Sequence, residues 1–379
     1  MKLTTAGESH GKALVAIIEG LPAHLKIEVE AINGALALRQ SGFGRGGRQK
    51  IEKDQVEILT GVRDCETLGS PVTLCIYNKD FANWENCMSA GSCDKAAMAK
   101  KALTKVRPGH ADLTGMQKFA QTDARNVLER ASARETAIRV AAGEVYRAYL
   151  AALGVEIGGY VREVCGVKDE GVYAFDELKA AKTTELGMLN PAIEAAAKEK
   201  IARLKAAGDT AGGAVEIRVR GLKSGFGSVM TYGEKLDARL AGALMSIQAV
   251  KGVEIGAGFS VACVCGSEVH DEISYTREKG FYRETNRAGG IEGGMSNGEE
   301  LVLRLAMKPI PTLMHGLKTV DYLSKESVVA ASERSDVCAI FALEIIAEAV
   351  VAEVLANAVA QRLGGDTMAE VTSRYALLP

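Results

Sequence analysis

The sequence contains few of the residues that mark several protein classes. Only 7 of its 379 residues are proline and 5% are aromatic, so a core has to be built mainly from Ala, Val, Leu and Ile. The eight cysteines are scattered without a CxxC pair, which indicates neither a disulfide framework nor a zinc site. We therefore expect reduced thiols, a cytoplasmic location and no bound metal.

Long apolar runs, linkers and strong net charge are also missing. Segment 1–22 lacks the apolar stretch of a signal peptide, and no run of about eighteen uncharged apolar residues could span a membrane. The net charge is −2, from 46 Lys and Arg against 48 Asp and Glu, which gives no general field to attract nucleic acid. We expect a single domain over 1–379, with no membrane or nucleic-acid partner.

The sequence is rich in segments with helical or strand periodicity. The Ala-rich pattern of 115–153 predicts one long helix, and the almost wholly apolar segment 336–363 predicts a helix buried between layers or at a subunit contact. Residues 258–266 are expected to form a strand, and the polar segment 80–98, with Trp84, an exposed loop. Because strands cluster between isolated long helices, the pattern favours an α+β fold with antiparallel sheets.

The segment Gly42–Gly47, GFGRGG, matches the GxGxxG pattern of dinucleotide-binding turns. It follows a helix-like stretch and opens no helix, which argues against a Rossmann domain. From Arg39 to Lys50 the chain carries four cations and no acid. Glycines let a ligand approach the backbone and arginines bind phosphate or carboxylate bidentately, so the segment is a candidate anion site. A solvated basic loop is an equal alternative.

Two short segments place a histidine among small or charged residues. Arg107–Asp112, RPGHAD, combines a turn, a cation, a carboxylate and His110, and Gly7–Gly11, GESHG, contains His10. Histidine is the side chain best suited to exchange a proton near pH 7. Ser9 and His10 point to opposite faces of an extended segment, so we interpret His10 as an independent proton donor. A turn with a surface histidine is the alternative at His110.

Further segments could contact an anion. Arg130 and Arg134 share a helix face, although two nearby glutamates favour a salt-bridged surface. The glycine-rich loop 289–298, Lys308–Thr312 and Arg334–Asp336 offer amides, a hydroxyl and cations that suit a phosphate or a flavin edge, whereas a plain glycine loop is the alternative. Together these segments suit a substrate with several negative charges and a reaction that moves protons and a leaving group.

Eight segments, in order along the chain, resemble the chorismate synthases. They extend from near the first residue to about 340 and are GESHG at 7–11, RQSGFGRGGRQKIEKDQVEILTGV at 39–62, RPGHAD at 107–112, ERASARETAIRVAAG at 129–143, LMSIQAVKGVEIG at 244–256, GGIEGGMSNGEEL at 289–301, KPIPT at 308–312 and RSDVCAI at 334–340.

The resemblance implies a β-α-β sandwich, with long central helices packed between antiparallel sheets, and a homotetramer. It implies a carbon–oxygen lyase that converts 5-enolpyruvylshikimate 3-phosphate to chorismate and phosphate by 1,4-anti elimination, the last common step of the shikimate pathway. That reaction requires reduced FMN without net redox change. NADPH would be the reductant, used by the enzyme itself or through an external flavin reductase.

The resemblance also implies roles for individual residues. His10 would protonate the departing phosphate, His110 would protonate or stabilise the reduced flavin, and Asp336 would act with flavin N5 in removing the C6 proton. The substrate, the flavin phosphate or NADP would be held by Arg39, Arg45, Arg48, Arg107 and Arg134, with Arg39 and Arg45 at the NADP positions. The flavin would contact Arg130, Ala131, Ser132, Gln248, Ala249, Gly293, Lys308, Pro309, Ile310, Pro311, Thr312 and Arg334.

Three positions depart from the commoner family pattern, with Ala131, Gln248 and Ser335 in place of Ser, Asn and His. Backbone contacts could replace the first two side chains, and Ser335 weakens the case for a third histidine. Two other function classes stay open. A flavoprotein oxidoreductase would consume reductant stoichiometrically, and a non-enzymatic anion- or RNA-binding protein would use the arginines alone.

Overall fold

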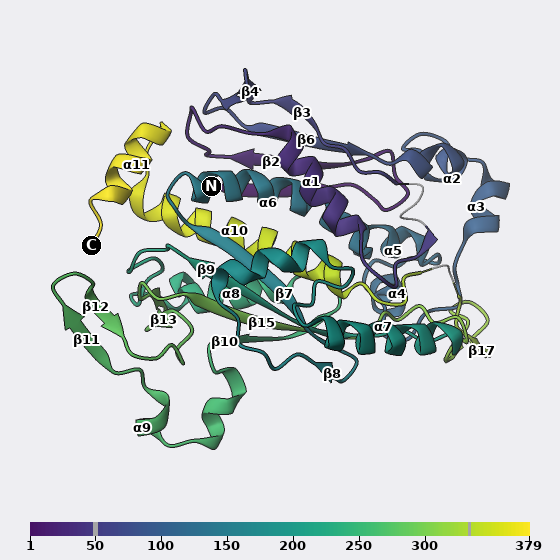
Figure 1. Ribbon diagram of the computed structural model, residues 1–379. Coiled ribbons are helices and arrows are strands. Elements are labelled where there is room, and N and C mark those ends of the chain that lie inside the picture. Colours follow the sequence, from purple (N-terminus) through teal and green to yellow (C-terminus); the bar gives the residue numbers. More distant parts are fainter. Residues whose placement is uncertain (48–51, 333–334) are drawn as a thin grey trace.

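The computed structural model describes residues 1–47, 52–332 and 335–379, and in it two antiparallel sheets face each other across a layer of helices (Figure 1). The N-terminal sheet has the strand order β1 (Lys2–Ala6), β2 (Ala13–Glu19), β6 (Val72–Tyr77) and β3 (Glu57–Thr60). The second sheet has the order β10 (Val250–Ile255), β15 (Leu301–Met307), β9 (Gly213–Arg220), β7 (Glu156–Val164) and β8 (Val167–Lys168).

Each sheet turns an alternating apolar face toward the helices. In β2 the side chains of Leu14, Ala16 and Ile18 are fully buried, because successive residues of a strand point to opposite faces. β9 and β15 repeat this pattern with alternating buried Val, Ile and Leu side chains. The sheets therefore supply the two outer walls of one large apolar core.

The helices between the sheets are α1 (Val29–Gln40), α6 (Thr136–Ala151), α8 (Leu236–Met245) and α10 (Ile340–Leu363). α6 packs on β2 and β6, α10 packs on β7 and β9, and the two helices pack against each other. At their crossing a Cβ on Gly143 would lie 2.3 Å from the Cβ of Ala349, so only glycine permits this close approach. The β-α-β sandwich and the buried C-terminal helix are thus confirmed.

Three sequence predictions of secondary structure are wrong, those for segments 115–153, 258–266 and 80–98. Segment 115–153 forms α4 (Asp112–Lys118), α5 (Arg125–Ala131), a 3₁₀ turn η3 (Ala133–Glu135) and then α6. The breaks fall at Ala120, which has a φ of 51°, and at Ser132, which is extended and accepts a hydrogen bond from the Arg134 amide. Segment 258–266 forms η6 (Gly258–Cys263) and enters α9 (Gly266–Val269), because Gly258 takes a φ of 55°.

The polar segment 80–98, expected to be an exposed loop, contains short helices with Trp84 half-buried among them. The remaining elements are β4 (Val62–Arg63), β5 (Glu66–Thr67), η2 (Lys79–Asn83), α2 (Glu85–Met88), α3 (Lys95–Lys101), η4 (Phe175–Thr183), α7 (Pro191–Ala206), η5 (Tyr232–Glu234), β11 (Ile273–Thr276), β12 (Gly280–Arg283), β13 (Ile291–Glu292), β14 (Met295–Ser296), β16 (Lys318–Val320), β17 (Ser327–Val329) and α11 (Met368–Ala376).

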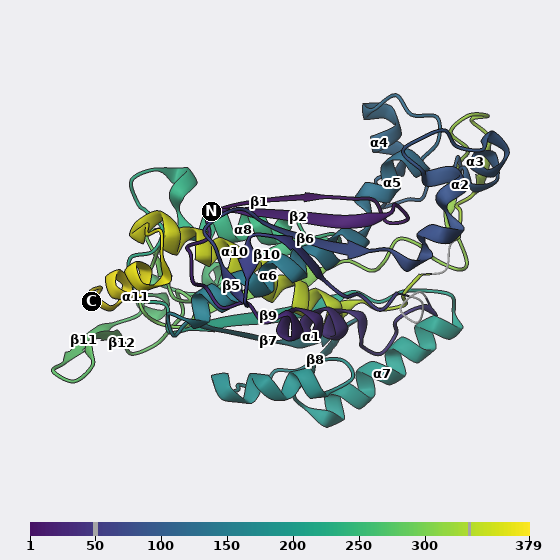
Figure 2. The same ribbon diagram turned by 90° about the horizontal axis from the view of Figure 1, so that it is seen from above.

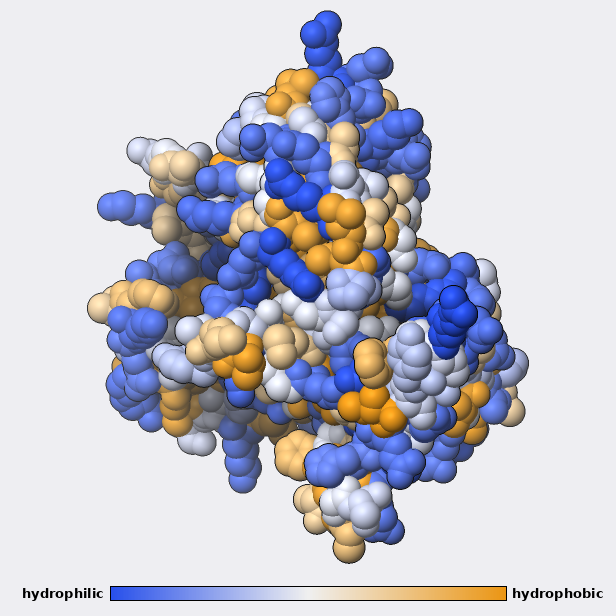
Figure 3. All heavy atoms as spheres, turned by 90° about the vertical axis from the view of Figure 1, so that its left-hand side faces the viewer, coloured by the Kyte–Doolittle hydropathy of each residue, from blue (hydrophilic) through white to orange (hydrophobic). Residues whose placement is uncertain are grey.

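The additions to the sandwich gather at its two ends (Figure 2). α2, α3, α4 and α5 lie together at one end, and α11 and the β11–β12 hairpin lie at the other. On the face that carries α11 and this hairpin, hydrophobic side chains are interspersed with hydrophilic ones (Figure 3). Among the helices of the described residues, none combines the length and apolarity needed to cross a membrane.

Candidate active site

A cavity of about 430 Å³ opens where the N-terminal part of α10 meets the loops at the α4–α5 end of the molecule. The apolar side chains of Leu343 and Ile346 form its floor, and segments far apart in the sequence form its walls. The sequence-predicted site residues that line it are Arg39, Arg45, Arg107, His110, Ala131, Ser132, Arg134, Gln248, Ala249, Lys308, Ile310, Pro311, Thr312 and Asp336.

The other predicted site residues do not line this cavity. Pro309 lies between two lining residues, and Arg130 points to the N-terminal strand, where its guanidinium donates to Thr5 O and Thr5 Oγ1. Gly293 lies in the turn between β13 and β14. Arg48 and Arg334 lie outside the described residues, and His10 occupies a neighbouring loop.

The arginines of the cavity are already paired with carboxylates. Arg134 lies 2.6 Å and Arg39 3.7 Å from Asp54 Oδ2, and both guanidiniums are buried. Burial lowers the pKa of Arg39 to about 9, an effect that the charges of Arg134 and Arg45 reinforce and that of Asp54 opposes. Such partners hold the guanidiniums in fixed positions. Their negative charges also offset part of the positive charge that the arginines bring to the cavity.

Hydrogen bonds to uncharged groups add to this fixation. Arg134 donates from Nε and NH2 to Asn78 Oδ1, at 3.0 and 2.9 Å, and Arg39 donates to Thr136 Oγ1 and Ala133 O. Asp54 and Asn78 were missed by the sequence reasoning. Asp54 is one of the first acids after the basic loop, which was a usable signal, whereas nothing in the sequence marked Asn78.

The RPGHAD turn forms a compact ionic triad. His110 Nδ1 lies 2.5 Å from Asp112 Oδ1, and Arg107 Nε donates to Asp112 Oδ2 at 2.8 Å. Burial would raise the pKa of Asp112, but the hydrogen bonds and charges of His110 and Arg107 outweigh it and hold this pKa far below its usual range. Since Nδ1 is bound to Asp112, Nε2 is the ring nitrogen that His110 can offer to a ligand.

The glycine–arginine loop is built around Asp336. Gly46 N donates to Asp336 Oδ1 at 2.5 Å, and Val337 N donates to Gly44 O at 2.8 Å. Arg45 Nε lies 3.2 Å from Asp336 Oδ2, at an angle that gives an ion pair without a hydrogen bond. α1 precedes this loop, so the interpretation that GFGRGG is not a Rossmann turn is confirmed.

Gln248 and Ala249 form a strained corner of the cavity wall. Ala249 has a φ of 69°, which an L-residue adopts at a cost of about 1–3 kcal/mol. The buried Gln248 Oε1 has no hydrogen-bond partner among the described residues. Strain and an unsatisfied buried acceptor at one place are typical of a binding site, because a ligand can satisfy the acceptor.

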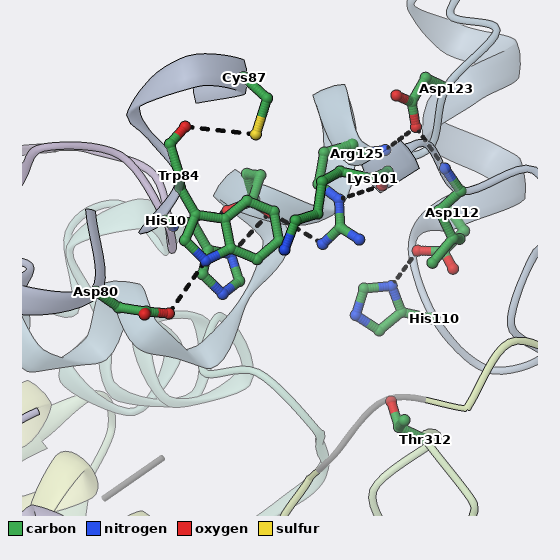
Figure 4. A network of polar contacts seen from close by, with 12 residues as sticks. His10, Asp80, Trp84, Cys87, Lys101, His110, Asp112, Asp123, Arg125 and Thr312 are labelled. Carbon is green, nitrogen blue, oxygen red and sulfur yellow. Dashed lines mark hydrogen bonds and ion pairs between the residues drawn. The ribbon is translucent and has the colours of Figure 1, made fainter. Parts of the chain in front are cut away.

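His10 is held beside the cavity by a second carboxylate. Its Nδ1 lies 2.9 Å from Glu129 Oε2, and the indole of Trp84 stacks on the imidazole at 4.0 Å between centroids (Figure 4). Asn78 connects this loop to the cavity, because its amide donates to Glu8 O and Gly11 O while its Oδ1 accepts from Arg134.

These features define an enzyme with a site for a small anionic ligand. Fixed guanidiniums, two histidines with carboxylate partners and an apolar floor are placed together by loops on a rigid sandwich. Comparisons with known proteins identify the family.

The sequence profile of the family described as chorismate synthase matches residues 1–360. The chain is 53% identical to the chorismate synthase of Geobacter metallireducens, covering 99% of this chain and 97% of that protein. It is 52% identical to that of Alkaliphilus metalliredigens, covering 99% and 98%. A crystal structure of a chorismate synthase superimposes with a TM-score of 0.79 at 37% identity, covering 99% and 96% of the two chains. The chain belongs to the chorismate synthase family and is an enzyme of the lyase class.

Proposed function

We propose that the chain converts 5-enolpyruvylshikimate 3-phosphate to chorismate and phosphate by 1,4-anti elimination, with reduced FMN bound in the same cavity. The observation that supports this most is the convergence of Arg45, Arg107, Arg134 and Lys308 on a cavity that also contains His110 and Asp336. A lyase acting on a phosphate ester needs anion-binding groups and proton-transfer groups at one place.

The charges of the cavity suit this substrate. Two carboxylates and a phosphate carry about four negative charges near neutral pH, and burying them without partners would be prohibitive. Lys308 donates to Gly109 O and forms no ion pair with a carboxylate in the part of the chain that the structure describes. Each charge-assisted hydrogen bond contributes roughly 1.5–3 kcal/mol, so Lys308 and the arginines together can hold the substrate.

The donor set and the apolar floor also fit a flavin. The unsatisfied Gln248 Oε1 can accept from a flavin N–H, while Leu343, Ile346 and Ile310 offer an apolar surface for the ring. Reduced FMN would supply a transient electron to the allylic system and recover it, so that no net redox change results. The residues proposed to hold it are Ala131, Ser132, Gln248, Ala249 and the segment Lys308–Thr312, with Arg130, Gly293 and Arg334 as further proposals.

Three side chains would handle protons. We propose that His10 protonates the departing phosphate and that His110, through Nε2, donates to the reduced cofactor or stabilises its charge. Asp336 would take part in removing the C6 proton, and its contacts with Gly46 N and Arg45 support this role by fixing the carboxylate.

An anaerobic assay with photoreduced FMN tests the proposed reaction. We expect one chorismate and one phosphate per substrate consumed, while the absorbance of the reduced flavin returns to its starting value. Stoichiometric oxidation of the flavin would instead make the protein an oxidoreductase. Absence of FMN binding in the presence of substrate would leave only an anion-binding protein.

We further propose that an external reductase supplies the reduced flavin. Arg39 and Arg45, the proposed NADP positions, are engaged with Asp54, Thr136 and Asp336, which leaves them little capacity for a second ligand. Under air, NADPH and FMN should therefore support turnover only after a flavin reductase is added. Turnover with NADPH and FMN alone would show that the chain reduces its own flavin.

A homotetramer of single-domain chains is also proposed. One apolar core includes residues from Leu14 to Tyr375, which supports a single domain and predicts one thermal unfolding transition. Phe259 and Phe281 are 81% and 76% exposed, and apolar side chains this exposed are typical of interfaces. Light scattering should give a mass of four times 40.1 kDa.

Eight free thiols support the proposed cytoplasmic location.

A further inference from the structure

His10 is fixed through one of its two ring nitrogens. Nδ1 lies 2.9 and 3.0 Å from the two carboxylate oxygens of Glu129, and the His10 backbone amide donates to Oε2 at 2.8 Å. The side chain of Glu129 is 2% exposed. Burial would raise the pKa of Glu129, but its contacts with His10 and Arg125 lower it overall, so the carboxylate stays ionised.

The face of the same ring is covered by the only tryptophan of the chain. Trp84 stacks on His10 with an interplanar angle of 26°, and its Nε1 donates to Asp80 Oδ2 at 3.1 Å. Lys101 Nζ also lies over the indole, 4.0 Å from its centroid (Figure 4). The indole is therefore held at its edge by a carboxylate and on its surface by a cation, and it cannot turn away from His10 without losing both contacts.

We infer that Glu129 and Trp84 are positioning residues for His10, which orient the imidazole so that Nε2 faces the ligand. The inference deepens the proposed function and rests on the role of His10 as a proton donor to the leaving phosphate. A carboxylate on Nδ1 fixes the tautomer and stabilises the imidazolium, as orienting carboxylates do in other acid–base sites. The contact with Glu129 alone would still let the imidazole rotate about χ2, and the stacked indole prevents this rotation.

The surroundings of His10 contain charges of both signs. Glu129 lies on α5 and Asp80 binds the indole from η2, and both favour the protonated ring. Arg125 of α5 and Lys101 of α3 oppose it, because both contact the Trp84 ring and Arg125 also contacts Glu129. Glu129 is the only one of the four that hydrogen-bonds to the ring among the described contacts, so its removal should have the largest effect.

The fluorescence of Trp84 measures this arrangement directly, because a protonated imidazole in contact with an indole quenches its emission. We expect wild-type emission to rise with pH in one transition as the imidazole loses its proton. His10→Gln should abolish the transition and His110→Gln should leave it in place. A wild-type emission without a transition, or a transition that survives in His10→Gln, overturns the inference.

Glu129→Gln tests the carboxylate. The midpoint of the fluorescence transition should move to lower pH by at least about one unit, since the charge that favours the imidazolium is lost. Glu85→Gln is the matched control, because Glu85 is exposed and adjacent to Trp84 in sequence, and it should move the midpoint by less than about 0.3 units. Equal shifts in the two variants would overturn the role of Glu129.

A measurement on the unaltered protein covers the case in which Glu129→Gln does not fold. Long-range ¹H–¹⁵N NMR should show the neutral His10 ring protonated on Nδ1, with the signal assigned by its loss in His10→Gln. A proton on Nε2 would contradict the inference.

Activity separates this inference from the proposed function. Trp84→Ala should lower kcat about tenfold with KM nearly unchanged, and Trp84→Phe should restore kcat because it restores the stack. Equal kcat in Trp84→Ala and wild type would overturn the role of Trp84. Full turnover by His10→Gln, with its fluorescence transition gone, would instead remove His10 from the proposed reaction while supporting its contact with Trp84.

Discussion

Two groups of buried charges lie on opposite faces of α10, and only one of them forms a candidate site. Leu343 and Ile346 face the active-site cavity, whereas Glu344 and Glu348 face an ionic cluster with Lys182 and Arg147. A cavity of about 500 Å³ adjoins this cluster and is larger than the active-site cavity of about 430 Å³. Size and buried charge therefore do not distinguish the two regions.

The difference lies in how the charges are paired. In the ionic cluster Lys182 Nζ contacts Glu344 and lies 3.0 Å from Glu348, and Arg147 lies 2.7 Å from Glu348. Two cations face the acidic side chains of Glu344, Glu348 and Glu144 there and are paired with them, so no positive charge is left to bind an anion. In the active-site cavity Lys308 and Gln248 Oε1 keep hydrogen-bonding capacity that no described residue uses. We call the ionic cluster, whose charges are paired with one another, the closed network, and the groups of the active-site cavity the open network. A closed network stabilises a fold, whereas an open network can bind a ligand.

The largest expected effect is on turnover, from a change in the open network. His110→Ala should lower kcat by about 10²- to 10⁴-fold, because it removes a proton-transfer group while Arg107 still neutralises Asp112. KM for the substrate should change by less than tenfold. Anaerobic steady-state kinetics with prereduced FMN measures both values. Near-normal kcat would remove His110 from the mechanism and weaken the contrast between the two regions.

A change in the closed network should act on stability alone. Lys182→Met leaves the buried carboxylate of Glu348 and the carboxyl group of Glu344 without their shared cation, which costs about 3–5 kcal/mol. Denaturant unfolding should show this loss, while kcat per folded molecule stays within twofold of wild type. Lys179→Met is the matched control, since Lys179 lies on the same 3₁₀ helix η4, is exposed, and should change stability by less than about 1 kcal/mol. A large loss of kcat in Lys182→Met would mean that the cluster belongs to the site.

The sequence was sufficient for the sandwich and for most of the cavity wall. Strand alternation and the apolar C-terminal helix predicted the fold. The motif matches predicted Arg39, His110, Gln248 and Asp336 as site residues, and all four line one cavity. Partners could not be predicted, because Asp54 contacts Arg134 across 80 positions and Glu129 contacts His10 across 119. Such contacts depend on the relative positions of α5 and α6, which the interruption of the helix at Ser132 sets. The local periodicity of the sequence predicted no interruption there.

The smallest expected effect concerns the one acid of the closed network that stays protonated. Burial, reinforced by the charge of Glu348, raises the pKa of Glu344 from 4.5 to about 8, whereas Lys182 and Arg147 outweigh burial at Glu348 and lower its pKa. The folded chain thus keeps a proton on Glu344 that the unfolded chain releases above about pH 4.5. The resulting stabilisation is complete below that pH and is lost as the pH rises through about 8.

Glu344→Gln should remove this pH dependence, because its amide can donate to Glu348 at every pH. Wild type and variant should unfold at similar denaturant concentrations at pH 5, and the variant should be more stable at pH 9 by on the order of 1–2 kcal/mol. Glu348→Gln, one turn away on α10, should instead destabilise the protein at pH 7, since Lys182 and Arg147 lose a charged partner. If both variants shifted stability in the same direction at pH 9, the assignment of the proton to Glu344 would be wrong.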